Sequence, residues 1–476
     1  MTTSETPDPV HDAGPQTGPP TLGASSGSSG RSLDTAMAGL AWIAILLAAG
    51  LWMMKPTLLE DAEPADEAAV PAGLLVGAQD QLAGRMTLGL NRLMPTAGGV
   101  DQAAALAGGS TAQQVAHAIL VAAISGPEDG LEDLDAIEAD PVAAVLVPPA
   151  RRAIESTGGG EPLSAGSADE LETRLGWFGT LASSLNDPEA VDRLAAQAEH
   201  VLYWVGGLVA IFLVAGLAGG IGLIILIVMT ATGGMSFRIP VVPRHGIYAE
   251  TFAIWLFGML VLQVAAGLLA TESTVMIGSV LAFFASLSVL AWPVVRGRSW
   301  SDVRAELGLV RPRLGDLPRG VAVWSMAIPF LAVGVALTLV LSVVVQFLSG
   351  EAPQPSHPAT EAAVGAGAWQ ILQLFLLASV AAPIVEETFF RGVLLTHLRG
   401  ATGRLNQWLS FGIAAIVSSV LFAAIHPQGL IFIPPLAGLA IGFCVGRAWQ
   451  GSLVPAMVAH GVSNALVMTL NVVLMS

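Results

Sequence analysis

The sequence predicts an all-α, polytopic membrane bundle of about nine spanning helices, with an inserted soluble helical domain. Three observations predict this fold class. Hydrophobic residues make up 54% of the chain and charged residues only 12%, whereas soluble globular domains contain roughly 25% charged residues. Apolar runs long enough to cross a hydrocarbon core of about 30 Å recur along the chain. Between the first two of these runs lies a long segment without a spanning stretch.

The N-terminal region divides into a polar tail and one apolar run. Residues 1–34 are rich in Gly, Ser, Pro and Thr and hold too few apolar side chains to offset the entropy of ordering, which predicts a disordered tail. Residues 35–54 form the first apolar run. A cleaved signal peptide would begin with a short basic region, whereas here a long polar segment comes first. We therefore interpret the run as a signal-anchor helix.

Residues 55–200 form the segment without a spanning stretch. Their apolar side chains recur at spacings of three and four, which is typical of amphipathic helices. We expect one helix to start at Ser167, with Glu170 completing a capping box, and another at Asp187 and Pro188. The segment contains 23 acidic and 7 basic residues and so carries the whole net charge of −16. It is interpreted as a spacer or as a domain that binds a protein partner, and no nucleic-acid partner is expected.

Eight further apolar runs follow, at about 201–230, 249–271, 273–295, 319–348, 369–398, 407–425, 431–447 and 453–475. The 296–319 loop contains six arginines and the 349–367 loop contains no basic residue. Because short positively charged loops stay in the cytoplasm, this contrast predicts a cytoplasmic N-terminus and an extracytoplasmic 55–200 domain in the cell membrane. Residues 201–301 are then additional membrane helices that precede a C-terminal unit, 302–476.

Ionisable residues inside the C-terminal apolar runs are the strongest functional signal, since each is costly in a bilayer unless it is paired or solvated. Glu387 and Arg391 are four residues apart and so lie within ion-pair reach on one helix face. Glu386 is turned away from Glu387 by about 100° and can face another group. A buried pair that only joins two helices would explain Glu387 and Arg391, but it would leave the second carboxylate unexplained.

Two further apolar runs contribute polar side chains. Phe422 and His426 share a face at the end of the 407–425 run, and His460 and Asn464 share a face in the last run. Each pair alone is compatible with a structural or interfacial role. Together with the two carboxylates and the arginine, they predict an aqueous chemical site inside the membrane.

Three segments resemble the EExxxR, FxxxH and HxxxN motifs of the CPBP family. They are EETFFR from Glu386 to Arg391, FAAIH from Phe422 to His426 and HGVSN from His460 to Asn464. This family of CAAX proteases and bacteriocin-processing enzymes includes the CAAX prenyl endopeptidase called Ras-and-a-factor converting enzyme and many bacterial Abi-type membrane proteins. The order and spacing also match. The resemblance covers about 302–476, most densely 369–470, and implies an intramembrane protease core.

Peptide-bond hydrolysis requires an activated water and donors aimed at the oxygen on which negative charge develops. We interpret Glu386 as the general base, with His426 sharing the orientation of the water or the proton transfer. His460 and Asn464 are interpreted as oxyanion stabilisers, because an imidazole and an amide can both donate hydrogen bonds. The resemblance implies the same roles, with Glu386 as the catalytic carboxylate.

Glu387, Arg391 and Phe422 are expected to support these four residues rather than to react. Two histidines and a glutamate could also bind zinc as a His₂Glu set. The HExxH pattern that supplies closely spaced zinc ligands is absent from the sequence. We therefore expect a mechanism without a metal or other cofactor, and a zinc-dependent metalloprotease that uses the same residues is the alternative.

The remaining features give three structural expectations. Gly438, Gly442 and Gly446 form a GxxxG-type stripe that should let their helix press against a catalytic helix. The helix that carries the two glutamates should be tilted, with a kink near Pro383. His397 should lie at the membrane interface, without a role in the site.

Two other function classes stay open at this point. One is a transporter or ion-coupled carrier that uses the buried charges as a relay, which an inverted repeat would favour, although the sequence shows none. The other is a catalytically silent membrane scaffold that displays the acidic domain. For a protease, the substrate would be a membrane or membrane-associated protein or peptide, and the residues do not specify whether it is prenylated.

Overall fold

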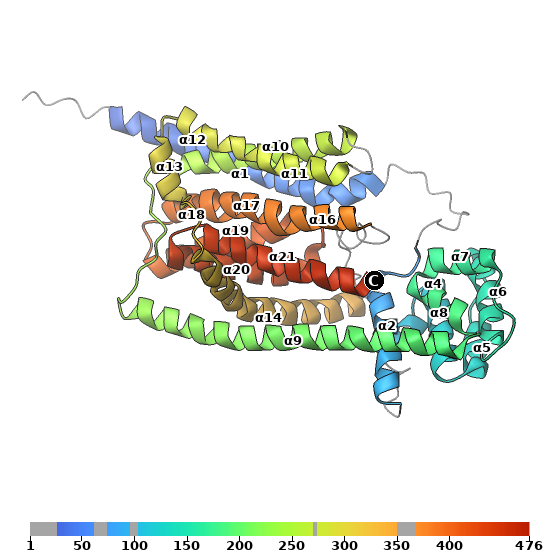
Figure 1. Ribbon diagram of the computed structural model, residues 1–476. Coiled ribbons are helices and arrows are strands. Elements are labelled where there is room, and N and C mark those ends of the chain that lie inside the picture. The colour runs from blue at the N-terminus through green and yellow to red at the C-terminus, as the bar shows by residue number, and fades with distance from the viewer. Residues whose placement is uncertain (1–25, 61–73, 96–102, 270–273, 350–366, 476) are drawn as a thin grey trace, which may run out of the picture.

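The helices assemble into an elongated bundle with a smaller helical domain at one end (Figure 1). The computed structural model describes residues 26–60, 74–95, 103–269, 274–349 and 367–475. Every regular element in these ranges is a helix, which confirms the predicted all-α fold class. The tail predicted at 1–34 falls largely outside the described residues, and α1 (Ser26–Glu60) begins before the expected start at residue 35.

Eight helical stretches in the described part of the chain are long and apolar enough to cross a membrane. They are α1, α9 (Pro188–Ala231), α10 (Gly246–Leu269), Met276–Val295, α14 (Asp316–Ser349), Ala368–Ala401, α19 (Gln407–Ala424) and Leu430–Gln450, which contains α20 (Ile433–Gln450). Met276–Val295 comprises most of α11 (Val275–Ser286), η2 (Leu287–Ala291) and α12 (Trp292–Val295). The ninth predicted run forms α21 (Val454–Met475), which is 22 residues long and packs against α14 and α20.

The outer surface of the bundle is apolar along the spanning helices. On α9, for example, Leu213, Val214 and Leu217 each expose about 70% of their surface. Exposing so many apolar side chains to water would oppose folding, whereas lipid tails solvate them. The chain is therefore a multi-pass membrane protein.

The domain that follows α1 has a hydrophobic core of its own. It contains α2 (Ala78–Leu93), α3 (Ala104–Ala107), α4 (Thr111–Ile124), α5 (Pro127–Asp135), α6 (Pro141–Glu155), α7 (Ala165–Leu175) and α8 (Trp177–Ser184). Ile119 and Leu120 of α4 are fully buried in a core that also contains Leu146 and Phe178. The expected start of a helix at Ser167 is wrong. Ser164 caps α7 instead, and its hydroxyl oxygen accepts the Ser167 N–H.

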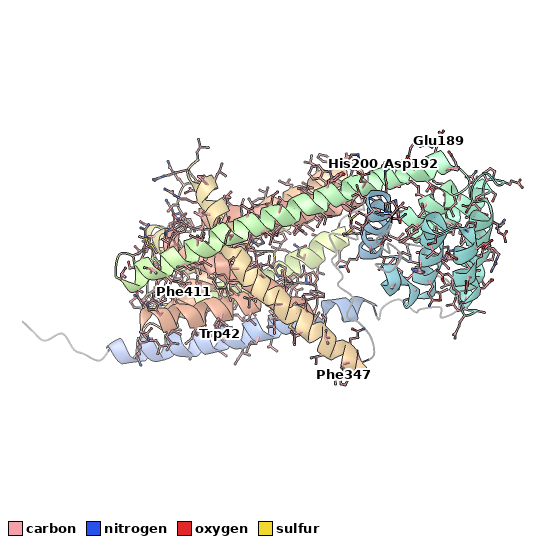
Figure 2. All side chains as sticks on the ribbon, turned by 90° about the horizontal axis from the view of Figure 1, so that it is seen from below. Trp42, Glu189, Asp192, His200, Phe347 and Phe411 are labelled. Atoms are coloured by element: carbon pink, nitrogen blue, oxygen red, sulfur yellow. The ribbon has the colours of Figure 1, made fainter. Side chains whose placement is uncertain are left out.

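One continuous helix, α9, joins this domain to the membrane bundle. The helix begins as predicted at Asp187 and Pro188, where the Asp187 carboxylate accepts the Glu189 N–H. It then runs for 44 residues, so the predicted boundary at residue 200 falls inside a helix rather than in a linker. Figure 2 shows Glu189, Asp192 and His200 along its domain end.

The arginine-rich loops gather at the end of the bundle opposite the helical domain (Figure 1). Arg296 forms an ion pair at 3.0 Å with Glu250 of α10, and Arg298 pairs with Glu306 of α13 (Trp300–Leu307). The buried Arg447 of α20 donates to the Glu306 carbonyl at 3.1 Å. These contacts attach the 296–315 loop to two membrane helices.

The glycine stripe of α20 faces α14 and not a helix that carries the candidate catalytic residues, so that expectation is wrong. A Cβ atom added to Gly438 would overlap the Phe330 carbonyl, and one added to Gly442 would overlap Ala327. At Gly446 it would overlap the Val323 side chain. Close approach to α14 therefore fixes the position of α20 in the bundle.

We expect Gly442→Ala to destabilise the bundle. The added methyl group has no room against Ala327, and overpacking of this kind typically costs about 1–3 kcal/mol. The midpoint of thermal unfolding in detergent should fall. Gly412→Ala in α19 is the matched control, because nothing lies within 4 Å of the added Cβ. Equal midpoints for the two variants would contradict the close α14–α20 contact.

Candidate active site

The two adjacent glutamates lie in the middle of the helical stretch from Ala368 to Ala401, here called the glutamate helix. It consists of α16 (Ala368–Leu376), η3 (Leu377–Ala381), α17 (Ala382–Glu387), η4 (Thr388–Leu394) and α18 (Leu395–Ala401). The segments η3 and η4 are π-helical and flank α17, which carries both glutamates. A π-turn holds one more residue than an α-turn and is frequent at functional sites. The kink near Pro383 and the tilt of this helix stay predictions.

Glu387 connects the charged groups of the site. Its Oε1 lies 3.0 Å from Arg391 Nη1 and 3.0 Å from His460 Nδ1. The side chains of Glu387 and Arg391 are both fully buried, so the spacing of four residues gives the ion pair that it predicts. Removing one member of such a pair would leave an uncompensated charge in a region of low dielectric.

Aromatic rings from three helices surround the Arg391 guanidinium. Its Cζ lies 4.5 Å from the ring centre of Phe422, 5.4 Å from that of Phe443 and 5.8 Å from that of Phe390. Nη2 also donates to the Ala440 carbonyl at 3.4 Å. Cation–π attraction is stronger where water is excluded. Sequence reasoning missed Phe443 and Phe390, although a buried arginine next to a phenylalanine signals such packing.

His460 lies between the two carboxylates. Its Nδ1 bonds to Glu387 at 3.0 Å, and its Nε2 is 3.8 Å from Glu386 Oε2. Since an ionised carboxylate can only accept, Nδ1 carries a hydrogen and donates it to Glu387. Nε2 is then the nitrogen that can exchange a proton with Glu386 or with a molecule between them. Sequence reasoning placed Glu386 on a separate face from Glu387, but the side chains of both glutamates lie next to the His460 imidazole.

Phe422 lies between the two histidines of the site. The Phe422 ring centre is 4.3 Å from that of His426 and 5.7 Å from that of His460. His426 Nδ1 is 2.6 Å from the Phe422 carbonyl oxygen, which can only accept, so Nδ1 carries a hydrogen. This bond fixes the orientation of the imidazole at the end of α19. The residue predicted as a support is thus the contact that both imidazoles share.

The side chain of Asn464 bonds to the backbone of the glutamate helix. The Asn464 Nδ2 donates to the Ala378 carbonyl, in the π-helical η3, at 2.7 Å. The amide nitrogen has a second hydrogen that this bond does not use. Asn464 therefore joins α21 to the glutamate helix one turn beyond His460, and it keeps one donor for another acceptor.

The arrangement of side chains shows which residues lie near enough to one another to be compared with a metal site. Among the residues that the structure describes, no group of three or more His, Cys, Asp or Glu side chains is placed to hold a metal ion. The nearest arrangement is His460 with its two glutamates. In this group the Nδ1 of His460 already forms a hydrogen bond with Glu387.

His397 is buried between helices, and its position at the membrane interface stays a prediction. Trp42 of α1 (Figure 2) donates to His397 Nε2 at 2.9 Å, and His397 Nδ1 bonds to the His245 carbonyl at 2.9 Å. Only 2% of the His397 surface is exposed. The imidazole therefore attaches the end of the glutamate helix to the predicted signal-anchor helix and to the segment that precedes α10.

Two carboxylates, an arginine and an imidazole therefore lie together inside the apolar helical bundle of a polytopic membrane protein. Residues 368–466 match the family model for the type II CAAX prenyl endopeptidase Rce1-like family. This range contains all three motifs, so the resemblance to the CAAX proteases is confirmed there and supports a CAAX-type intramembrane protease. No curated protein and no solved structure gives a significant match to the chain.

The buried charges should be interdependent. Glu387→Gln leaves Arg391 without its carboxylate, and Arg391→Met leaves Glu387 without its guanidinium, each at a cost of about 3–5 kcal/mol. The double variant removes both charges and should unfold at a higher temperature than either single variant. Thermal unfolding in detergent measures all three. Additive losses in the double variant would contradict a coupled pair.

Proposed function

We propose that this protein is an intramembrane endopeptidase in which Glu386 activates the water that attacks the peptide bond. The observation that carries the proposal is the distance of 3.8 Å between Glu386 Oε2 and His460 Nε2, with the other nitrogen of His460 held by Glu387. This distance exceeds that of a hydrogen bond, so Glu386 is available to bind a water. Its side chain is 14% exposed, whereas that of Glu387 is fully buried.

Charge balance supports a role for one mobile proton. The guanidinium of Arg391 and the carboxylate of Glu387 form one ion pair, which has no net charge. Glu386 and His460 form the second pair. This pair has no net charge in two states: with an ionised Glu386 and a protonated His460, or with a protonated Glu386 and a neutral His460. A region of low dielectric favours a pair of groups whose charges sum to zero. Glu386 can thus accept a proton from water while His460 donates one to the oxyanion or to the leaving amine.

His426 and Asn464 complete the proposed mechanism. His426, whose Nδ1 hydrogen bonds to the Phe422 carbonyl, orients the water or shares its proton. Asn464 contributes the amide hydrogen that Ala378 does not use, and with His460 it stabilises the oxyanion. Glu387, Arg391 and Phe422 hold these groups in position.

The proposed substrate is a membrane protein or a membrane-anchored peptide that enters the bundle from the lipid. The description of the matched family suggests prenylated CAAX sequences as the first class to test. We propose that hydrolysis needs no metal. A zinc-dependent reaction at the same residues is the alternative.

We also propose a cytoplasmic N-terminus and an extracytoplasmic acidic domain, which is a candidate surface for a protein partner. The arginine-rich loops all lie at the end of the bundle away from that domain (Figure 1). Short basic loops favour the cytoplasmic side, so this arrangement supports the proposed orientation.

Glu386→Gln should abolish most cleavage, because the amide keeps the shape of the carboxylate but cannot accept a proton. Loss of a general base typically lowers kcat by about 10²–10⁴-fold. Cleavage of a farnesylated CAAX peptide measures the effect in reconstituted protein, and proteomics of membrane fractions extends it to other substrates. Glu161→Gln, an exposed carboxylate of the acidic domain, is the matched control.

Each alternative to this proposal has its own outcome. Unchanged cleavage by Glu386→Gln would refute the role of Glu386. One zinc per chain in the purified wild type, with activity lost to a chelator and restored by zinc, would establish the metal-dependent reaction. A wild type that alters no membrane protein or peptide would favour the carrier or the scaffold.

A further inference from the structure

Pro383 lies inside the glutamate helix, three residues before Glu386. A proline inside a helix has no N–H to donate, so a carbonyl on the preceding turn loses its partner. An unpaired carbonyl is especially costly in a membrane, where no water replaces the lost bond. A membrane helix therefore tolerates an internal proline when another group donates a hydrogen bond to the unpaired carbonyl.

The carbonyls that Pro383 leaves without a donor can be identified from the bonding of η3. The Ala382 N–H bonds to the Leu377 carbonyl five residues back, which is the π pattern. In the same pattern Pro383 would bond to Ala378, and in the α pattern it would bond to Ser379. Neither carbonyl can receive a hydrogen bond from a proline nitrogen.

Residues of α21 meet both of these carbonyls. The Asn464 Nδ2 donates to the Ala378 carbonyl at 2.7 Å. The Ser379 carbonyl approaches Gly461 so closely that a Cβ added there would lie 2.7 Å from the oxygen. Gly461 directly follows His460 in the sequence. The helix that supplies the imidazole therefore also accommodates the irregular backbone beside Pro383.

We infer that Asn464 is a positioning residue that replaces the missing N–H of Pro383 and thereby holds the π-turn next to the two glutamates. The π-turn sets the register between the glutamates and α21. Conversion to an α-turn would shift them by one residue, which is a rotation of about 100°. That rotation would separate Glu386 from His460 Nε2. The effect on catalysis rests on the proposed function, whereas the effect on the helix does not.

The second π-turn also accepts a side-chain hydrogen bond from another helix, at a carbonyl that already has a backbone donor. In η4 the Leu395 N–H bonds to the Phe390 carbonyl five residues back. The buried Ser418 of α19 also donates to this carbonyl, at 3.2 Å. A side chain from a neighbouring helix thus bonds a π-turn carbonyl on each side of Glu386 and Glu387.

A double-mutant cycle between Asn464→Ala and Pro383→Ala tests the inference in the full-length protein. Asn464→Ala should lower the midpoint of thermal unfolding and abolish most cleavage of a farnesylated CAAX peptide. Pro383→Ala restores a backbone N–H, so it should raise the midpoint more in the Asn464→Ala background than in the wild type. It should also return part of the activity that Asn464→Ala loses, through the restored register of Glu386.

Pro329→Ala, which replaces a proline inside α14, is the control for the general gain in helix propensity. It should raise the midpoint by the same amount with and without Asn464. If Pro383→Ala also raised both midpoints equally, Asn464 would not replace the proline N–H and the inference would be overturned. The midpoints do not depend on cleavage, so an inactive wild type would refute the proposed function and leave this test intact.

Discussion

The requirement that a buried arginine be neutralised determines how the membrane bundle is assembled. Arg391 is enclosed by the Glu387 carboxylate, the Ala440 carbonyl and the faces of three aromatic rings. These groups come from the glutamate helix, α19 and α20, and α21 joins them through the bond from His460 to Glu387. Moving any one of these helices would remove a contact from Arg391 or from Glu387. The contacts that stabilise the bundle are therefore the same contacts that arrange the candidate active site.

Much of this organisation could be predicted from the sequence. Apolar runs locate the spanning helices because a bilayer requires a fixed length of apolar chain. The spacing of four residues places Glu387 against Arg391, and the high cost of a charge in lipid indicates that isolated polar residues on different helices should meet. The structure brings His460 to both glutamates and gives it Phe422 as a contact shared with His426.

The contacts that sequence reasoning missed are those between helices distant in the chain. The spacing of Gly438, Gly442 and Gly446 indicates a close approach but not the partner, which is α14. The sequence around His397 does not indicate its hydrogen bonds to Trp42 and to the His245 carbonyl, because both partners lie far away in the chain. Helical periodicity describes one helix at a time and contains no information about which face meets which neighbour.

The continuous course of α9 determines how the acidic domain is joined to the bundle. At 1.5 Å per residue its 44 residues measure about 66 Å, roughly twice the thickness of a hydrocarbon core. The acidic domain is therefore attached to the bundle through helix and not through a loop. α9 packs on α14 where Gly219 lets the Ser325 carbonyl approach, and α14 in turn packs against α20 and α21. The acidic domain and the helices around the glutamates are thus connected through a continuous series of helix contacts.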